Sequence, residues 1–133
     1  MASTLRRGSI LIIDDEDLVR SAVGRVLQRS YVVDGVSSVA DALVRIERSP
    51  ALTLLLCDES VGAERGSELH ERLLRDGDPV SERMLFMTGD RHAEHLRALG
   101  GGHILFKPFA ARDLLEVVST RIEQLAQVHL RTC

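Results

Sequence analysis

Five short, almost continuously apolar runs alternate along the chain with segments of helical spacing, and this alternation constrains the fold more than any other feature. The runs are 10–14, 31–36, 52–57, 84–87 and 104–106. Such runs are typical of strands that are covered on both faces. Between and after them, apolar residues recur every three or four positions, which predicts five amphipathic helices. Strict alternation implies right-handed crossovers, so we predict an α/β fold: a doubly wound, five-stranded parallel sheet in a three-layer sandwich.

Composition limits the chain to one domain and argues against several classes of protein. The chain has 133 residues, enough for one filled core, which we expect to cover residues 8–128 with terminal extensions at 1–7 and 129–133. The net charge of -3 gives no basic surface for direct binding of nucleic acid. No apolar run approaches the roughly 20 residues that span a membrane, and the first residues lack the apolar core of a secretory signal. We therefore expect a cytoplasmic protein with no direct membrane contact.

Three aspartates stand where two of the predicted strands end. Asp14 and Asp15 close the first run, and Asp58 follows the third. In an open parallel sheet, the C-terminal ends of the strands share one edge, and ligands bind where the strand order reverses. We therefore expect the three carboxylates to meet at this edge. Like charges a few ångströms apart disfavour joint ionisation, so such a cluster favours a divalent cation that prefers oxygen ligands.

A hydroxyl and an ammonium group follow two later strands. Thr88 comes after the fourth run and Lys107 after the fifth, so both are expected at the edge that holds the aspartates. A carboxylate can attack phosphorus and form an acyl phosphate, provided that the charge on the phosphoryl oxygens is neutralised. A bound Mg²⁺ and a lysine together supply that neutralisation.

In this order and at these strand ends, the motifs resemble the receiver domain of two-component response regulators. They are Ile-Ile-Asp-Asp-Glu at 12–16, Leu-Leu-Cys-Asp at 55–58, the glycine at 66, Thr-Gly at 88–89 and Phe-Lys-Pro-Phe at 106–109. The resemblance covers residues 9–125 and implies a flavodoxin-like sheet with strand order 2-1-3-4-5. It also implies a protein that takes a phosphoryl group from a histidine kinase or histidine phosphotransfer protein and then switches partner binding. Such a domain is not an enzyme beyond catalysing its own aspartyl phosphorylation and dephosphorylation.

The resemblance further assigns a phosphoacceptor and its metal ligands. Asp58 would be the phosphoacceptor. Asp15 directly and Asp14 partly through water would hold Mg²⁺ (or Mn²⁺). Asp58 itself and the backbone carbonyl of Ser60 would complete the protein ligands.

The residues after the last two strands would bind the phosphoryl group. Thr88 would hydrogen-bond one of its oxygens. Lys107 would pair with Asp58 before the reaction and with the phosphoryl group after it. By the same resemblance, the Lys107-Pro108 peptide bond would be cis.

Two regions depart from the family pattern. Relatives usually carry Met-Pro at the third and fourth positions beyond the phosphoacceptor, where this chain has Val61 and Gly62. Glycine frees a backbone that proline would fix, so we expect a more mobile loop there. Three residues before the lysine, where relatives often carry a Tyr or Phe that rotates as a switch, this chain has Ile104. The switch position thus lacks an aromatic ring, and the route of output signalling is left open.

Partner surfaces follow from the same resemblance. A kinase or phosphotransfer protein would dock over the first helix and the loop after the fifth strand, with Leu18, Val19 and Pro108 as candidate contacts. A homodimer through the fourth helix, fifth strand and fifth helix is a further expectation. Whether the chain acts alone or as part of a hybrid kinase is left open by the sequence.

Other interpretations of these residues differ in strength. A phosphate-independent pseudo-receiver, acting as a protein interaction module, is favoured by Ile104 and the altered loop but opposed by the complete set of acidic, hydroxyl and lysine residues. A phosphohydrolase with an aspartyl intermediate would need an acid two residues beyond its nucleophile, where this chain has Ser60. His92 and His95 stand three residues apart and could bind a metal, although a solvated helix face is the commoner arrangement.

Overall fold

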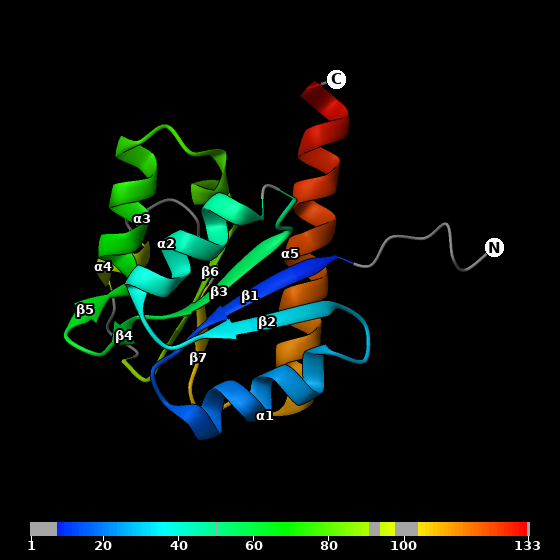
Figure 1. The fold of residues 1–133 in the computed structure, drawn as a ribbon. Coiled ribbons are helices and arrows are strands. Elements are labelled where there is room, and N and C mark those ends of the chain that lie inside the picture. The colour runs from blue at the N-terminus through cyan, green and yellow to red at the C-terminus, as the bar shows by residue number, and fades with distance from the viewer. Residues whose placement is uncertain (1–7, 50, 91–93, 98–103, 133) are drawn as a thin grey trace.

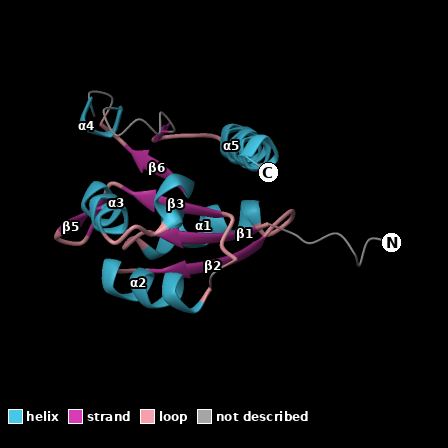
Figure 2. Ribbon diagram, turned by 90° about the horizontal axis from the view of Figure 1, so that it is seen from above, coloured by secondary structure: helices cyan, strands magenta, loops and turns pink. Residues whose placement is uncertain are grey.

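The computed structural model describes residues 8–49, 51–90, 94–97 and 104–132. Its main sheet has five parallel strands in the order β2-β1-β3-β6-β7. These are β1 (Ser9–Ile13), β2 (Val32–Val36), β3 (Leu54–Asp58), β6 (Met84–Thr88) and β7 (Ile104–Phe106). Figure 2 shows β2, β1, β3 and β6 side by side in this order. Counted along the chain, the order is 2-1-3-4-5, which confirms the predicted flavodoxin-like sheet.

Helices connect the strands and cover both faces of the sheet (Figure 1). They are α1 (Asp17–Leu27), α2 (Val39–Arg48), α3 (Gly66–Arg75), α4 (Glu94–Arg97) and α5 (Ala111–Thr132), with a short 3₁₀ helix, η2 (Pro79–Arg83). Of the helix predicted around 96–99, residues 98 and 99 lie outside the described part. Helix α5 continues past residue 128, where we expect the domain to end. No helix in the described ranges is both long and apolar enough to cross a membrane.

The core consists of two apolar layers, one on each face of the sheet. Leu11 and Ile13 of β1 pack with residues of α2 and α3, whereas Ile10 and Ile12 pack with residues of α1 and α5. Successive side chains of a strand point to opposite faces, so a continuous apolar run is what a doubly covered strand requires. The three-layer sandwich is therefore a direct consequence of these runs.

Local signals set the ends of the helices that frame the site. Ser38 precedes α2 with an extended backbone, and its side chain accepts a hydrogen bond of 3.1 Å from the backbone N–H of Asp41. Such a cap satisfies one of the free N–H groups of the first helical turn. Before α3, the backbone N–H of Arg65 donates to Oε1 of Glu68 at 3.0 Å. Helix α3 begins at Gly66, after the segment 59–65 that follows Asp58.

The segment between β3 and α3, where we expect a more mobile loop, has regular structure. It forms a small antiparallel hairpin of β4 (Ser60–Val61) and β5 (Glu64–Arg65). Gly62 lies in its turn with a φ of 62°, a left-handed conformation that glycine adopts without strain. Val61 is buried and packs in the core. Gly62 thus makes the tight turn of this hairpin. Its two strands have two residues each, which is too short for the sequence to show the alternation typical of strands.

Buried His70 provides a test of the packing between α3 and η2. Its ring lies edge-on to Phe86 with the centroids 6.0 Å apart. Burial lowers the pKa of His70 below 6.5, although a hydrogen bond with the backbone of Ser81 and the charge of Glu71 oppose the shift. The unfolded chain therefore takes up a proton before the folded protein does. The stability that neutral His70 contributes is complete above about pH 6.5 and is lost as the pH falls further.

We accordingly expect the free energy of unfolding to fall less steeply in His70→Gln than in the wild type between about pH 7 and pH 5. Urea denaturation at several pH values measures both slopes. Asp14 acts in the opposite sense, because burial raises its pKa to about 6 and the folded protein then gains stability as that carboxyl takes up its proton. It is present in both proteins, so the difference between them isolates His70. Equal slopes would show that His70 is not held in its neutral form.

Candidate functional site

The carboxyl ends of the strands bring four of the predicted residues to one edge of the sheet. Asp14 follows β1, and its backbone N–H donates to the carbonyl of Val36 at 3.1 Å. Asp58 ends β3 and Thr88 ends β6. Lys107 follows β7, and its N–H donates to the carbonyl of Thr88 at 2.8 Å. Because these strands are parallel and in register, their last residues share one edge.

Lys107 brings a positive charge to the two buried aspartates at this edge. Its Nζ donates a hydrogen bond to Oδ2 of Asp58 and lies 3.7 Å from Oδ2 of Asp14. Both aspartates are buried, with Asp14 0% and Asp58 5% exposed. Burial alone would lower the pKa of Lys107, but its hydrogen bond to Asp58 and the charges of the two aspartates outweigh burial and raise it. The lysine is therefore held in its charged form between two carboxylates.

The Asp14 carboxylate is only partly compensated. Its Oδ1 accepts a hydrogen bond of 2.9 Å from the backbone N–H of Glu16, whereas Oδ2 is buried without a hydrogen-bond partner among the described residues. Burial raises the pKa of Asp14 to about 6; the Glu16 hydrogen bond opposes this rise and the charge of Asp58 adds to it. A buried carboxylate oxygen with no donor is a natural ligand for a cation.

The Asp15 carboxylate is bonded to the hairpin turn and not to Lys107. Its Oδ2 accepts a hydrogen bond of 3.0 Å from the backbone N–H of Gly62, so the carboxylate closes against the hairpin turn. In the ranges that the structure describes, no three His, Cys, Asp or Glu side chains are grouped to hold a metal. Mg²⁺ usually takes only one or two protein carboxylates and keeps several waters. The pair of carboxylates from Asp14 and Asp58 thus suits Mg²⁺ better than a metal that needs a complete protein cage.

A cavity of about 490 Å³ opens beside Asp58. Thr88 and Ser60 line it together with Asp58. The backbone N–H of Ser60 donates to Oδ1 of Asp58 at 3.0 Å, and Oγ1 of Thr88 accepts from the N–H of Asp90 at 3.1 Å. Because Thr88 uses an oxygen lone pair in this bond, its hydroxyl hydrogen is left to donate to another acceptor. The cavity therefore offers a carboxylate, a hydroxyl and room for a small anionic group.

The remaining sequence-predicted positions are as follows. The Lys107-Pro108 peptide bond is cis. Ile104 is partly buried and packs against the core cluster on the α2 and α3 side of the sheet. Cys57 is buried next to the site, and burial raises the pKa of its thiol far above the usual value, so it stays protonated. His92 lies outside the described residues.

Glu59 and His95 line the cavity but were not among the residues predicted for the phosphoacceptor site. Glu59 follows Asp58, and its carboxylate accepts hydrogen bonds from the backbone N–H and the hydroxyl of Ser67, at 2.8 and 3.0 Å. The same carboxylate also contacts Nε2 of His95 on α4. The position of Glu59 next to Asp58 in the sequence could have indicated that it lies near the site. The position of His95 could not, because sequence spacing cannot tell which loop a helix will face.

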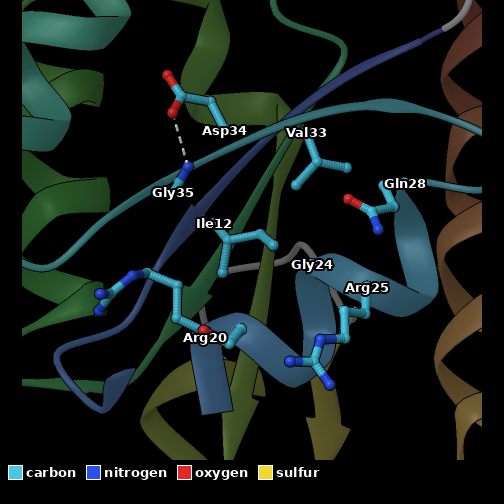
Figure 3. A pocket seen from close by; sticks show the side chains of 9 residues that line it. Ile12, Arg20, Gly24, Arg25, Gln28, Val33, Asp34 and Gly35 are labelled. Carbon is cyan, nitrogen blue, oxygen red and sulfur yellow. Dashed lines mark hydrogen bonds between the residues drawn. The ribbon is translucent and has the colours of Figure 1, made fainter. Parts of the chain in front are cut away.

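A second hollow, of about 480 Å³, lies between α1 and β2 (Figure 3). Arg20, Arg25 and Asp34 supply charge to its lining, and Arg20 and Asp34 are already engaged. Arg20 donates to the carbonyl of Asp14 at 2.8 Å and pairs with Asp17, and Asp34 pairs with Arg45. The reactive groups therefore gather at the strand-end cavity rather than here.

Comparisons with known proteins agree with this geometry. A family model described as the response regulator receiver domain matches residues 10–119. A search of curated proteins gives no significant match.

Solved structures share the fold. The signal receiver domain of a putative Luxo repressor protein from Vibrio parahaemolyticus has a TM-score of 0.80 at 19% identity, covering 93% of this chain and 96% of that one. The chemotaxis response regulator CheY4 of Vibrio cholerae has a TM-score of 0.76 at 20% identity, covering 86% and 98%. A CheY-like receiver domain protein from Methanospirillum hungatei has a TM-score of 0.75 at 26% identity, covering 91% and 98%. Because the family model spans most of the chain, the protein belongs to the response regulator receiver domain family.

Proposed function

We propose that this receiver domain accepts a phosphoryl group on Asp58 and thereby switches its binding to a partner. The donor is a phosphohistidine on a histidine kinase or histidine phosphotransfer protein. The observation that carries the proposal is the surroundings of Asp58: a buried carboxylate, bonded to Lys107, beside a cavity that Thr88 also lines. A nucleophilic carboxylate with a fixed cation and a hydroxyl donor is the equipment that phosphoryl transfer needs.

The transfer exchanges one bond to phosphorus for another. An oxygen of Asp58 attacks the phosphorus, the bond from phosphorus to the histidine nitrogen of the donor breaks, and that nitrogen keeps the electron pair. The ammonium of Lys107 lies where negative charge builds on the phosphoryl oxygens, and the hydroxyl of Thr88 donates to one of them. The domain catalyses this step, and the later loss of the phosphoryl group to water, only on itself.

The metal of this proposal is Mg²⁺ or Mn²⁺. Asp58, Asp15 directly and Asp14 partly through water would hold it, together with the backbone carbonyl of Ser60. For Asp15, this requires its carboxylate to turn from the N–H of Gly62 towards the metal. The unbonded Oδ2 of Asp14 supports this assignment. When bound, the metal supplies further neutralisation of the phosphoryl oxygens.

Partner docking is proposed for the surface around α1 and the loop after β7. Leu18 is 87% exposed, Val19 is partly buried and Pro108 is exposed, so α1 and the segment after β7 each present an exposed apolar residue. An exposed apolar side chain next to a reactive site is what a transient protein contact uses. We further propose that the receiver covers residues 8–128 of a cytoplasmic protein that contacts neither nucleic acid nor membrane directly, and that α4, β7 and α5 form a homodimer surface.

One feature favours a second candidate, a pseudo-receiver that binds partners without phosphate. Ile104 is packed against the core where an aromatic switch would rotate, so that route of signalling is absent. An interaction module would keep the fold and need no switch.

Chemical mapping of the modified residue separates the two candidates. The protein is incubated with Mg²⁺ and acetyl phosphate and then treated with borohydride, which reduces an acyl phosphate to the alcohol. We expect homoserine at position 58 in the wild type and in the exposed-carboxylate control Asp76→Asn. If position 58 stays aspartate while a control receiver is converted to homoserine in the same experiment, the result would favour the pseudo-receiver.

A further inference from the structure

Glu59 and His95 form a contact on the wall of the phosphoacceptor cavity. Both residues line the cavity beside Asp58. Ser67 holds Glu59 in place, because the backbone N–H and the hydroxyl of Ser67 both donate to the Glu59 carboxylate. Nε2 of His95, on α4, meets the same carboxylate. The carboxylate of Glu59, the residue after Asp58, thus connects His95 on α4 with Ser67 at the start of α3.

The polar contact of His95 with Glu59 lies next to an apolar contact of α4 with the core. Leu96, the following residue, is 1% exposed and packs in the core cluster on the α2 and α3 side. His95 and Glu59 are less buried, with side chains 45% and 12% exposed. A change at the cavity can therefore reach His95, whereas the packing of Leu96 depends on the core.

We propose that the contact between Glu59 and His95 holds α4 while Asp58 is unmodified, and that phosphorylation of Asp58 breaks it. The proposal rests on the proposed function and names the element that reports it. A phosphoryl group brings a charge of about -1.5 to -2 and three strong acceptor oxygens into the cavity that both residues line. It repels the Glu59 carboxylate and competes with it for the N–H of His95. Glu59 remains bound to Ser67, so His95 is the partner that leaves.

The contact also fills a gap in the signalling route. By the family resemblance, an aromatic side chain at position 104 would move in response to Thr88, but this chain has Ile104, which packs against the core. The path through Glu59 needs no such ring, because it begins at the residue next to Asp58 and ends on α4. Release of His95 would loosen α4 and change the surface that a partner meets.

Hydrogen exchange of the peptide that contains Glu94–Arg97 tests this proposal in the intact chain. Four proteins are compared with and without Mg²⁺ and acetyl phosphate: wild type, His95→Ala, His95→Gln and the neighbouring control Glu94→Gln. Intact mass of the same samples shows how much of each is phosphorylated. In the unphosphorylated state we expect His95→Ala to exchange about tenfold faster than wild type, as loss of a hydrogen bond to a charged group predicts. His95→Gln, which keeps an N–H donor, falls between them.

Phosphorylation is then expected to speed exchange in the wild type and in Glu94→Gln, and to change His95→Ala little. Equal exchange of wild type and His95→Ala before phosphorylation would overturn the claim that the contact holds α4. A phosphorylated wild type with unchanged exchange would overturn the coupling. Absence of any phosphoryl gain would instead defeat the proposed function and the coupling with it, while the comparison of unphosphorylated proteins would still decide whether His95 holds α4.

Discussion

Replacing Lys107 by methionine is expected to slow phosphorylation of Asp58 by about 10²- to 10³-fold and to strengthen binding of Mg²⁺. The first effect follows because a fixed cation aimed at developing charge typically contributes a factor of that size. The second follows because the ammonium of Lys107 would repel a bound metal cation. This ammonium is bonded to Asp58 and lies 3.7 Å from Oδ2 of Asp14. The two effects have opposite signs, so a variant that merely misfolds cannot produce both.

Rates of labelling by acetyl phosphate and titration with Mg²⁺ measure these effects. The matched control is Arg112→Met, which removes an exposed cation from the start of α5 and should leave both quantities unchanged. Weaker Mg²⁺ binding in Lys107→Met would mean that the lysine does not compete with the metal. An unchanged labelling rate would mean that the lysine does not neutralise the phosphoryl group.

Gly66→Ala is expected to lower the free energy of unfolding by about 1–3 kcal/mol, the usual range for overpacking. A Cβ at position 66 would lie 2.7 Å from the carbonyl oxygen of Asp58 and 3.0 Å from Sγ of Cys57. The first of these is the backbone carbonyl oxygen of the proposed phosphoacceptor itself, so it can move only if the end of β3 moves. Alanine is otherwise the better helix former, and any loss of stability therefore reports the clash.

Urea denaturation measures this loss, and Gly89→Ala is the matched control. A Cβ at position 89 would meet nothing within 4 Å, so this variant should unfold like the wild type. The geometry at Gly66 would be wrong if Gly66→Ala were as stable as Gly89→Ala. Because Asp58 shares the displaced backbone, Gly66→Ala should also be phosphorylated more slowly, which labelling by acetyl phosphate can show.

The sheet could be predicted from sequence because each strand carries its own signal. The run at 84–87 lies within β6, and the run at 104–106 coincides with β7. Such runs record burial on both faces, a property of the strand itself. The order of strands was taken from the family resemblance, since nothing local specifies which strand lies next to which.

Parts of the site depend on contacts between distant segments, and these were not predictable. Asp15 turns to the N–H of Gly62, 47 residues away, although its position at a strand end suggested a meeting of three carboxylates. His95 reaches Glu59 across 36 residues. The hairpin β4-β5 was missed because two-residue strands show no periodicity. Sequence thus located the acidic edge, the lysine and Thr88, whereas the contact between Glu59 and His95 emerged only from the fold.

Intact-protein mass after incubation with acetyl phosphate, with and without Mg²⁺, tests the central claim most directly. We predict that the wild type and Asp76→Asn gain the mass of one phosphoryl group when Mg²⁺ is present, and that neither gains it when the metal is removed by a chelator. Asp58→Asn should gain nothing in either condition. A wild type that remains unmodified while a control receiver is labelled, or an Asp58→Asn protein that is labelled like the wild type, would contradict the assignment of Asp58 as the phosphoacceptor.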